Sequence, residues 1–217
     1  MNPRLLLDPL LYLVTDRKLS HGRPLTEIVE KAVAGGVTVV QLREKDMSTR
    51  AFIEEALAVK MVLDIHGVPL LINDRTDVAL AVDAAGVHLG QEDMPCGIAR
   101  RVLGADKIIG LSVENVQQAE EANSKDIDYI AVSPVFSTST KKELTKGLGI
   151  EGVKKIASLS KHPAVAIGSI KENNAAAIMQ AGASGIAVVS AICSSPDPEM
   201  AAAGLLREAL KGRIIKY

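Results

Sequence analysis

The sequence repeats one pattern eight times: a short β-branched apolar segment, a polar loop and an amphipathic helical segment. Because a helix then lies in every crossover, consecutive strands are predicted to be parallel. Eight parallel strands favour a closed (β/α)8 barrel of the TIM type, an α/β fold, over an open sheet. The predicted strands span residues 11–14, 37–42, 70–72, 87–89, 108–111, 127–132, 165–167 and 186–189, and the helices span 25–34, 48–66, 77–83, 98–103, 114–122, 150–159, 172–181 and 199–211.

Length and composition indicate one domain over residues 1–217, with 47% hydrophobic residues to fill its core. The 25 Lys and Arg residues nearly balance the 26 Asp and Glu residues, and aromatic residues make up only 2%, so a nucleic-acid partner is not expected. No stretch approaches the ~20 apolar residues of a membrane span. Asp8 and Pro9 interrupt the apolar N-terminal run, which argues against a signal peptide. We therefore predict a cytoplasmic protein without a membrane partner, and leave a homo-oligomer open.

The two cysteines, Cys96 and Cys193, are far apart in the sequence and match no metal-binding or redox spacing. We predict reduced thiols, although a pair formed by the fold is not excluded.

In a barrel of this kind, the chemistry lies in the loops that follow the strands. Gln41, Arg43 and Lys45 come at the end of the second predicted strand and are spaced two apart. Side chains at this spacing point to the same side of an extended backbone. An amide, a guanidinium and an ammonium together can bind the edge of a heterocycle and a polyanion. The alternative is a solvated strand end.

Acidic residues follow the third and fourth predicted strands, as Asp74 and as the pair Glu92 and Asp93. Mg²⁺ commonly takes one or two carboxylates and completes its shell with phosphates and water, so a cation site is expected here. A turn explains Asn73 and Asp74 about as well. His88 alternates with apolar neighbours, which favours a hydrogen-bonded packing histidine over a catalytic one.

Small and hydroxyl-bearing residues follow the remaining strands. Ser112 is a candidate ligand group or a helix cap. Residues 137–142 carry four hydroxyls and two ammonium groups, typical of phosphate binding and also of a surface loop. Barrels frequently bind phosphate after strands seven and eight, where Gly168, Ser169, Val189 and Ser190 stand, although tight turns would also explain them. No catalytic triad, glycosidase carboxylate pair or zinc spacing is present. These patterns predict two phosphorylated small molecules, or one bisphosphorylated one, bound with Mg²⁺.

Seven segments at these strand ends match one family in order and cover nearly the whole chain. They are QLREK (41–45), ND (73–74), HLGQED (88–93), GLS (110–112), TSTK (138–141), AIGSI (166–170) and VVSAI (188–192). In them the chain resembles thiamine-phosphate synthase. QLREK and HLGQED together are the specific part of the resemblance.

The resemblance implies that a hydroxymethylpyrimidine pyrophosphate is joined to a thiazole phosphate, with release of pyrophosphate. It implies a dissociative mechanism, in which cations neutralise the departing pyrophosphate and the thiazole nitrogen attacks a benzylic-type cation. Arg43, Lys45, Ser112 and Lys141 are the implied catalytic residues. The pyrimidine pyrophosphate would contact Gln41, Leu42, Arg43, Glu44, Lys45, Asn73, Ser112 and Lys141; Mg²⁺ would bind Asp74 and Asp93; and the thiazole phosphate would contact Thr138, Ser139, Thr140, Ser169, Val189 and Ser190.

The chain departs from the family pattern at Ser169, where two glycines in succession are usual. Three other functions stay open: a thiazole tautomerase of the same superfamily, a non-catalytic barrel that binds thiamine phosphates, and a Schiff-base aldolase that uses Lys45 or Lys141. Both aspartates and the whole of QLREK are present, and an isomerase that handles no pyrophosphate would not need them. We therefore expect the synthase.

Overall fold

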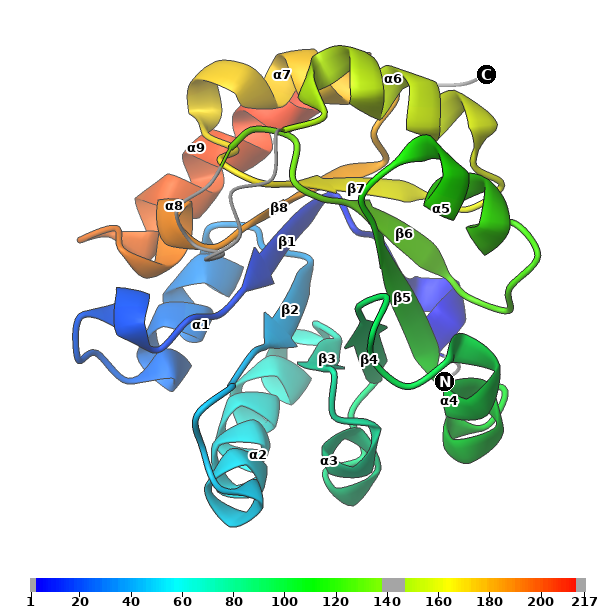
Figure 1. Cartoon of the computed structure of the whole chain (residues 1–217). Helices are drawn as coiled ribbons and strands as arrows, with labels where there is room; N and C mark the ends of the chain where they lie inside the picture. Colours follow the sequence, from blue (N-terminus) through cyan, green and yellow to red (C-terminus); the bar gives the residue numbers. More distant parts are fainter. Residues whose placement is uncertain (1–2, 138–146, 214–217) are drawn as a thin grey trace.

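The computed structural model describes residues 3–137 and 147–213, and its eight strands form one closed parallel barrel in sequence order (Figure 1). β1 pairs with β2 on one side and with β8 on the other, which closes the sheet. The predicted (β/α)8 barrel is therefore confirmed. The strands are β1 (Leu11–Val14), β2 (Val39–Leu42), β3 (Leu70–Asn73), β4 (Gly86–Leu89), β5 (Ile108–Val113), β6 (Tyr129–Val132), β7 (Ala164–Ile167) and β8 (Gly185–Val188).

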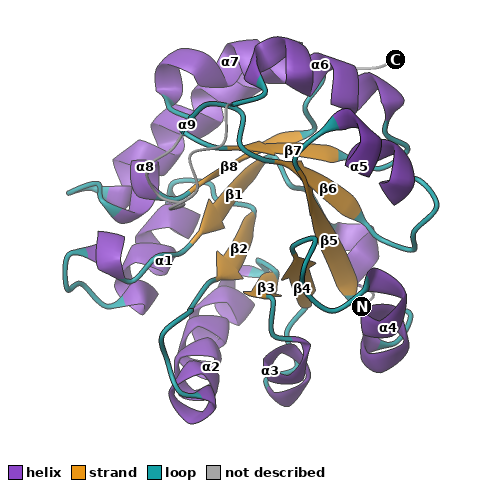
Figure 2. Cartoon of the chain, in the orientation of Figure 1, coloured by secondary structure: helices purple, strands orange, loops and turns teal. Residues whose placement is uncertain are grey.

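The helices form a layer around the outside of the barrel (Figure 2). They are α1 (Leu25–Ala34), α2 (Thr49–His66), α3 (Thr76–Ala81), α4 (Cys96–Leu103), α5 (Val116–Ala122), α6 (Gly149–Leu159), α7 (Glu172–Gln180), α8 (Ser190–Cys193) and α9 (Pro198–Gly212), with 3-10 turns at Pro3–Leu6 and Lys18–Ser20. The sequence did not predict α8 or the two turns, because three or four residues are too few to show a helical period.

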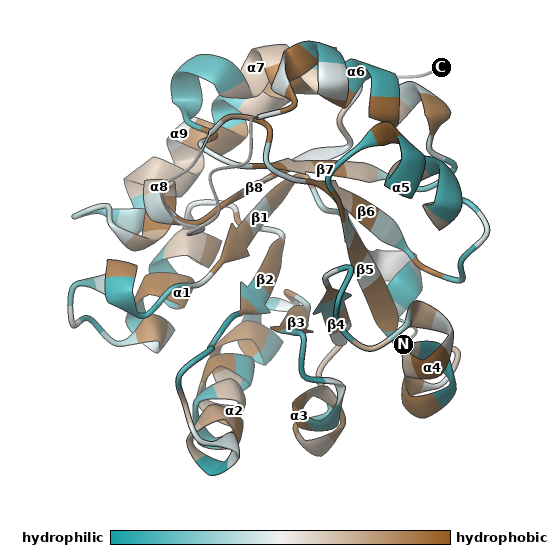
Figure 3. Ribbon diagram, viewed as in Figure 1, coloured by the Kyte–Doolittle hydropathy of each residue, from teal (hydrophilic) through white to brown (hydrophobic). Residues whose placement is uncertain are grey.

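Two apolar layers hold the barrel together. The larger layer lies between the strands and the helices, and in Figure 3 the strands are mostly brown while the helices carry both brown and teal residues. The smaller layer fills the inside of the barrel, because alternate side chains of each strand point inward. The inner layer consists of Tyr12, Val14, Val39, Leu71, Ile108, Tyr129, Ala131, Val165 and Ala187.

A charged cluster ties the N-terminal turn to the end of the barrel opposite the strand-end loops. Arg4 pairs with Asp126 at 3.0 Å and with Asp128 at 2.6 Å. Asp128 also pairs with Arg100 at 3.1 Å and accepts a hydrogen bond from the Ile109 N–H at 2.8 Å. Because the Asp128 side chain is only 9% exposed, both arginines compensate a carboxylate that is nearly removed from water.

Both cysteines, Cys96 and Cys193, are free and buried, as predicted. No helix in residues 3–137 or 147–213 is long and apolar enough to cross a membrane.

Candidate active site

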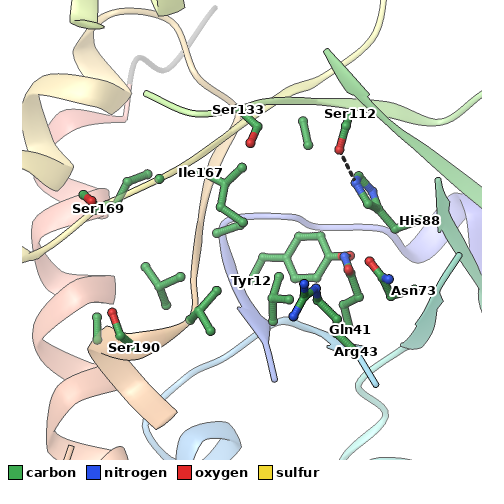
Figure 4. Close-up of a pocket in the computed structure, with 18 of the residues that line it drawn as sticks. Tyr12, Gln41, Arg43, Asn73, His88, Ser112, Ser133, Ile167, Ser169 and Ser190 are labelled. Carbon is green, nitrogen blue, oxygen red and sulfur yellow. Dashed lines mark hydrogen bonds between the residues drawn. The ribbon is translucent and has the colours of Figure 1, made fainter. Parts of the chain in front are cut away.

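A cavity of about 840 Å³ lies at the carboxyl ends of the strands. Ten of the residues predicted to contact a ligand or the metal line it, so these loops converge (Figure 4). Gln41, Arg43, Asn73 and His88 lie near one another, while Ser169 and Ser190 lie on the other side of the cavity in this view. The ten residues are Gln41, Arg43, Lys45, Asn73, Asp74, Asp93, Ser112, Ser169, Val189 and Ser190.

Two predicted contact residues do not line the cavity. Leu42 is fully buried in the outer apolar layer. Glu44 turns toward Arg17, whose Nε lies 3.2 Å from a Glu44 oxygen. The alternation of an extended chain explains both positions, because it sends residues 41, 43 and 45 inward and 42 and 44 outward. Four other predicted contacts, Thr138, Ser139, Thr140 and Lys141, lie outside the described residues.

The two cations that follow β2 are each held by an aspartate. Arg43 Nη1 lies 3.5 Å from Asp16, and Lys45 Nζ lies 3.4 Å from Asp74. The Arg43 side chain is 26% exposed and that of Lys45 is 57% exposed. Both contacts are long for ion pairs with a direct hydrogen bond, so the two cations can turn toward a polyanion at low energetic cost.

Asp74 and Asp93 approach each other across the loops after β3 and β4. Burial raises the pKa of Asp74, the neighbouring Asp93 carboxylate raises it further, and Lys45 opposes both effects. Asp93 is fixed by a hydrogen bond of 2.6 Å from the Gly90 N–H. Glu92 is exposed and does not line the cavity, so the structure separates the two members of the acidic pair.

The two carboxylates fit a magnesium ion that keeps several ligands from substrate and water. Within residues 3–137 and 147–213 no group of three or more His, Cys, Asp or Glu side chains is arranged to hold a metal. A cation bound here would be held by Asp74 and Asp93 and would complete its shell with other oxygen atoms. Its charge would also relieve the repulsion between the two carboxylates.

A chain of hydrogen bonds crosses the barrel at the floor of the cavity. Gln41 Nε2 donates to the Tyr12 hydroxyl at 2.7 Å, and the Tyr12 and Tyr129 hydroxyls lie 2.8 Å apart. The Tyr129 hydroxyl lies 2.8 Å from His88 Nδ1, and His88 Nε2 lies 2.9 Å from Ser112 Oγ. His88 is therefore hydrogen-bonded within the barrel, as the alternation favoured, and it also lines the cavity.

The helix-cap interpretation of Ser112 is wrong. α5 begins at Val116, and its N-cap is Asn115, whose side chain accepts a hydrogen bond from the Gln118 N–H at 2.9 Å. Ser112 lies within β5 and bonds to His88 instead. Its hydroxyl is therefore available to the cavity.

The loops after β7 and β8 supply small residues on the opposite side. Gly168 has φ of 120° and Ser169 has φ of 52°, both in the left-handed region that glycine adopts most easily. This backbone explains the two glycines usual at these positions. The Ser169 hydroxyl donates to the Ser137 carbonyl at 2.8 Å, so the serine joins the loops after β6 and β7. α8 begins at Ser190, directly after β8.

Known proteins match the chain over most of its length. The family model described as thiamine monophosphate synthase matches residues 11–192. The chain belongs to this family. Thiamine-phosphate synthase of Clostridium botulinum (strain Kyoto / Type A2) is 50% identical over 196 residues, which are 90% of this chain and 96% of that protein. Thiamine-phosphate synthase of Vibrio campbellii is 53% identical over 196 residues, with the same shares of both chains.

A solved structure agrees with the sequence relatives. Thiamine phosphate pyrophosphorylase from Pyrococcus furiosus superposes with a TM-score of 0.87 at 37% identity, and the match covers 95% of this chain and 98% of that one. Relatives at about 50% identity identify the chain as a transferase of the thiamine-phosphate synthase type, an enzyme of thiamine biosynthesis.

The synthase cavity also contains residues that the sequence patterns did not identify. Tyr12 and Ser133 line it, and Tyr129 supports it from below. Tyr12 and Tyr129 had a usable signal, because each is a hydroxyl-bearing residue within an apolar strand, and a buried phenol needs a hydrogen-bond partner. Ser133 had no distinguishing signal in the sequence, since it resembles any polar residue at a strand end.

Proposed function

We propose that this synthase joins 4-amino-2-methyl-5-hydroxymethylpyrimidine pyrophosphate to 4-methyl-5-(2-phosphoethyl)thiazole, giving thiamine monophosphate and pyrophosphate. The observation that carries the proposal is the difference between the two sides of the cavity. Arg43, Lys45 and the paired carboxylates follow β2, β3 and β4 at one side, and at the other side the small residues of the β7 and β8 loops lie with Lys171, Glu172 and Asn173. A pyrophosphate with its metal suits the first side, and a single phosphate suits the second.

The residues around the first side would bind the pyrimidine pyrophosphate. Gln41, Asn73 and Ser112 offer hydrogen bonds to the pyrimidine, while Arg43 and Lys45 meet the pyrophosphate, with Lys141 contributing as the family pattern implies. Asp74 and Asp93 would hold Mg²⁺, which supplies positive charge beside the departing pyrophosphate.

We propose a dissociative mechanism. The bond between the methylene carbon and the pyrophosphate oxygen breaks first, and its electron pair leaves with the pyrophosphate. The pyrimidine amino group stabilises the resulting cation, and the thiazole nitrogen then forms the new carbon–nitrogen bond. This chemistry needs positioning and charge stabilisation more than a nucleophilic side chain. Ser169, Val189 and Ser190, together with Thr138, Ser139 and Thr140, would fix the thiazole phosphate. We expect the reaction to take place in the cytoplasm.

The test is pyrophosphate release from the purified protein, with each substrate alone and with both, in the presence and absence of Mg²⁺. Release should need both substrates and the metal. Asp93→Asn keeps an oxygen for the Gly90 N–H but removes the charge, so it should lower activity by at least a hundredfold, and added Mg²⁺ should restore part of it.

Glu92→Gln is the matched control, because Glu92 is the adjacent carboxylate, is exposed and does not line the cavity. It should retain native activity. Release without Mg²⁺, or equal losses in the two variants, would contradict the cation site. Binding of either substrate without any release would contradict the synthase reaction itself.

A further inference from the structure

Five polar side chains from five strands form the hydrogen-bonded chain at the floor of the cavity, and all but Tyr129 line it. Tyr12 and Tyr129 are at most 1% exposed, and Gln41 and His88 are 3% and 7% exposed. The rest of the inner layer is apolar, so leucine or valine would fill this space at no cost in buried polar atoms. These hydrogen bonds connect Gln41 to Ser112, two of the three side chains that the proposed function places against the pyrimidine.

The donor and acceptor of each hydrogen bond in this row can be assigned by starting at Gln41. Gln41 Nε2 donates to the Tyr12 oxygen, so the Tyr12 hydroxyl hydrogen must point elsewhere. Its other hydrogen-bond partner among the described residues is the Tyr129 hydroxyl, which therefore accepts. The Tyr129 hydrogen then points to His88 Nδ1. Burial raises the pKa of both phenols well above the ordinary value, so both keep their protons.

The same direction continues through the imidazole. With Nδ1 accepting, a neutral His88 carries its hydrogen on Nε2 and donates it to Ser112 Oγ. The hydroxyl hydrogen of Ser112 is then directed away from His88 and toward the cavity. At the other end, Gln41 Nε2 is committed to Tyr12, which fixes the amide so that Oε1 is free to accept.

We propose that Tyr12, Tyr129 and His88 are positioning residues that fix Gln41 as an acceptor and Ser112 as a donor toward the pyrimidine. The inference rests on the proposed function for the identity of the ligand. An aminopyrimidine matches this pair, because its amino group donates and its ring nitrogens accept. The 4-oxo analogue offers a carbonyl in place of the amino group and an N–H on the ring, so it has the opposite pattern and is rejected.

Tyr129→Phe tests the relay, because it keeps the ring and removes the hydroxyl that joins Tyr12 to His88. We expect the KM for the pyrimidine pyrophosphate to rise about tenfold, the scale of one hydrogen bond to a ligand, while the KM for the thiazole phosphate stays within twofold. Discrimination against the 4-oxo pyrimidine pyrophosphate, measured as a competitive inhibitor, should fall by a similar factor.

Thr38→Val is the matched control. It also removes a hydroxyl that bonds to the barrel, to the Leu11 carbonyl at 3.1 Å, but Thr38 directly precedes β2 and does not line the cavity. It should leave both KM values and the discrimination unchanged. An unchanged pyrimidine KM in Tyr129→Phe, or an equal rise in both KM values or in both variants, would overturn the relay.

The histidine tautomer provides a readout that does not depend on turnover. In the native protein without ligands, ¹⁵N NMR of the imidazole of His88 should show the hydrogen on Nε2 and an accepting Nδ1. The Nδ1–H tautomer at neutral pH would overturn the assigned direction. If the native protein releases no pyrophosphate but shows the expected tautomer, which Tyr129→Phe then shifts, the relay stands and the proposed reaction fails.

Discussion

Gly110 on β5 is the position where a single methyl group should test the geometry of the site most directly. Gly110 pairs with Tyr129 across β5 and β6, and a Cβ added at residue 110 would overlap the ring and hydroxyl of Tyr129. The ring has little space to move, because Tyr129 is fully buried and stacks on His88 with 5.6 Å between ring centroids. Gly110→Ala should therefore displace the phenol.

The size of the effect follows from two losses and one gain. Overpacking a buried site costs about 1 to 3 kcal/mol. Moving the hydroxyl breaks its hydrogen bonds to Tyr12 and His88, at about 1 kcal/mol each. Alanine in a strand recovers roughly 0.5 to 1 kcal/mol relative to glycine. The free energy of unfolding should fall by about 2 to 4 kcal/mol, which lowers the melting temperature by roughly 10 °C in a chain of this size.

Urea unfolding followed by circular dichroism measures this change as a lower midpoint at an unchanged m-value. Gly97→Ala on α4 is the matched control, because nothing lies within 4 Å of a Cβ built there. It should be neutral or stabilise the protein by up to about 1 kcal/mol. If Gly110→Ala had the same urea midpoint as the native protein, the ring of Tyr129 would not lie against Gly110, and the hydrogen-bonded chain would lose its central member.

Three further outcomes are expected. Burial raises the pKa of Cys193 to about 11, so the thiol of the unfolded chain ionises first and the free energy of unfolding falls as pH rises above about 9. The loss should be about 1 kcal/mol at pH 10, and urea titrations should find no such loss in Cys193→Ala. Asp128→Asn leaves two arginines without their shared carboxylate and should lower the free energy of unfolding by about 3 kcal/mol. Asp126→Asn, at a side chain 57% exposed, should lower it by less than about 1 kcal/mol, and equal losses would contradict the account of this cluster. Ser169→Gly should be more stable than Ser169→Ala by about 1 kcal/mol in thermal unfolding, because only glycine relieves the left-handed backbone, and the opposite order would refute this reason.

The sequence predicted the barrel and most of the cavity because both depend on periodic patterns. Alternation along the second strand correctly placed Gln41, Arg43 and Lys45 on one side, and the topology brought Asp74 and Asp93 together from neighbouring loops. The same alternation explains why Leu42 and Glu44, included through the family motif, do not reach the cavity.

The sequence could not reveal the inside of the barrel. Tyr12 and Tyr129 are 117 residues apart, and only the closure of the sheet brings their hydroxyls into contact. Short-range patterns carry no information about such pairs. Ser112 was ambiguous for a local reason, since Asn115 stands three residues later and is an equally good cap. Only the observed start of α5 decides between them.

The paired tyrosines also give the molecule an optical probe of its own. The chain contains no tryptophan, three tyrosines and two weakly emitting phenylalanines, so tyrosine dominates its ultraviolet emission. Two of the three are Tyr12, which lines the cavity, and Tyr129, which bonds to it. Ligand binding at Gln41 or Ser112 should therefore change the intrinsic fluorescence without any label, so that substrate titrations and rapid-mixing experiments can follow the pyrimidine side of the cavity directly.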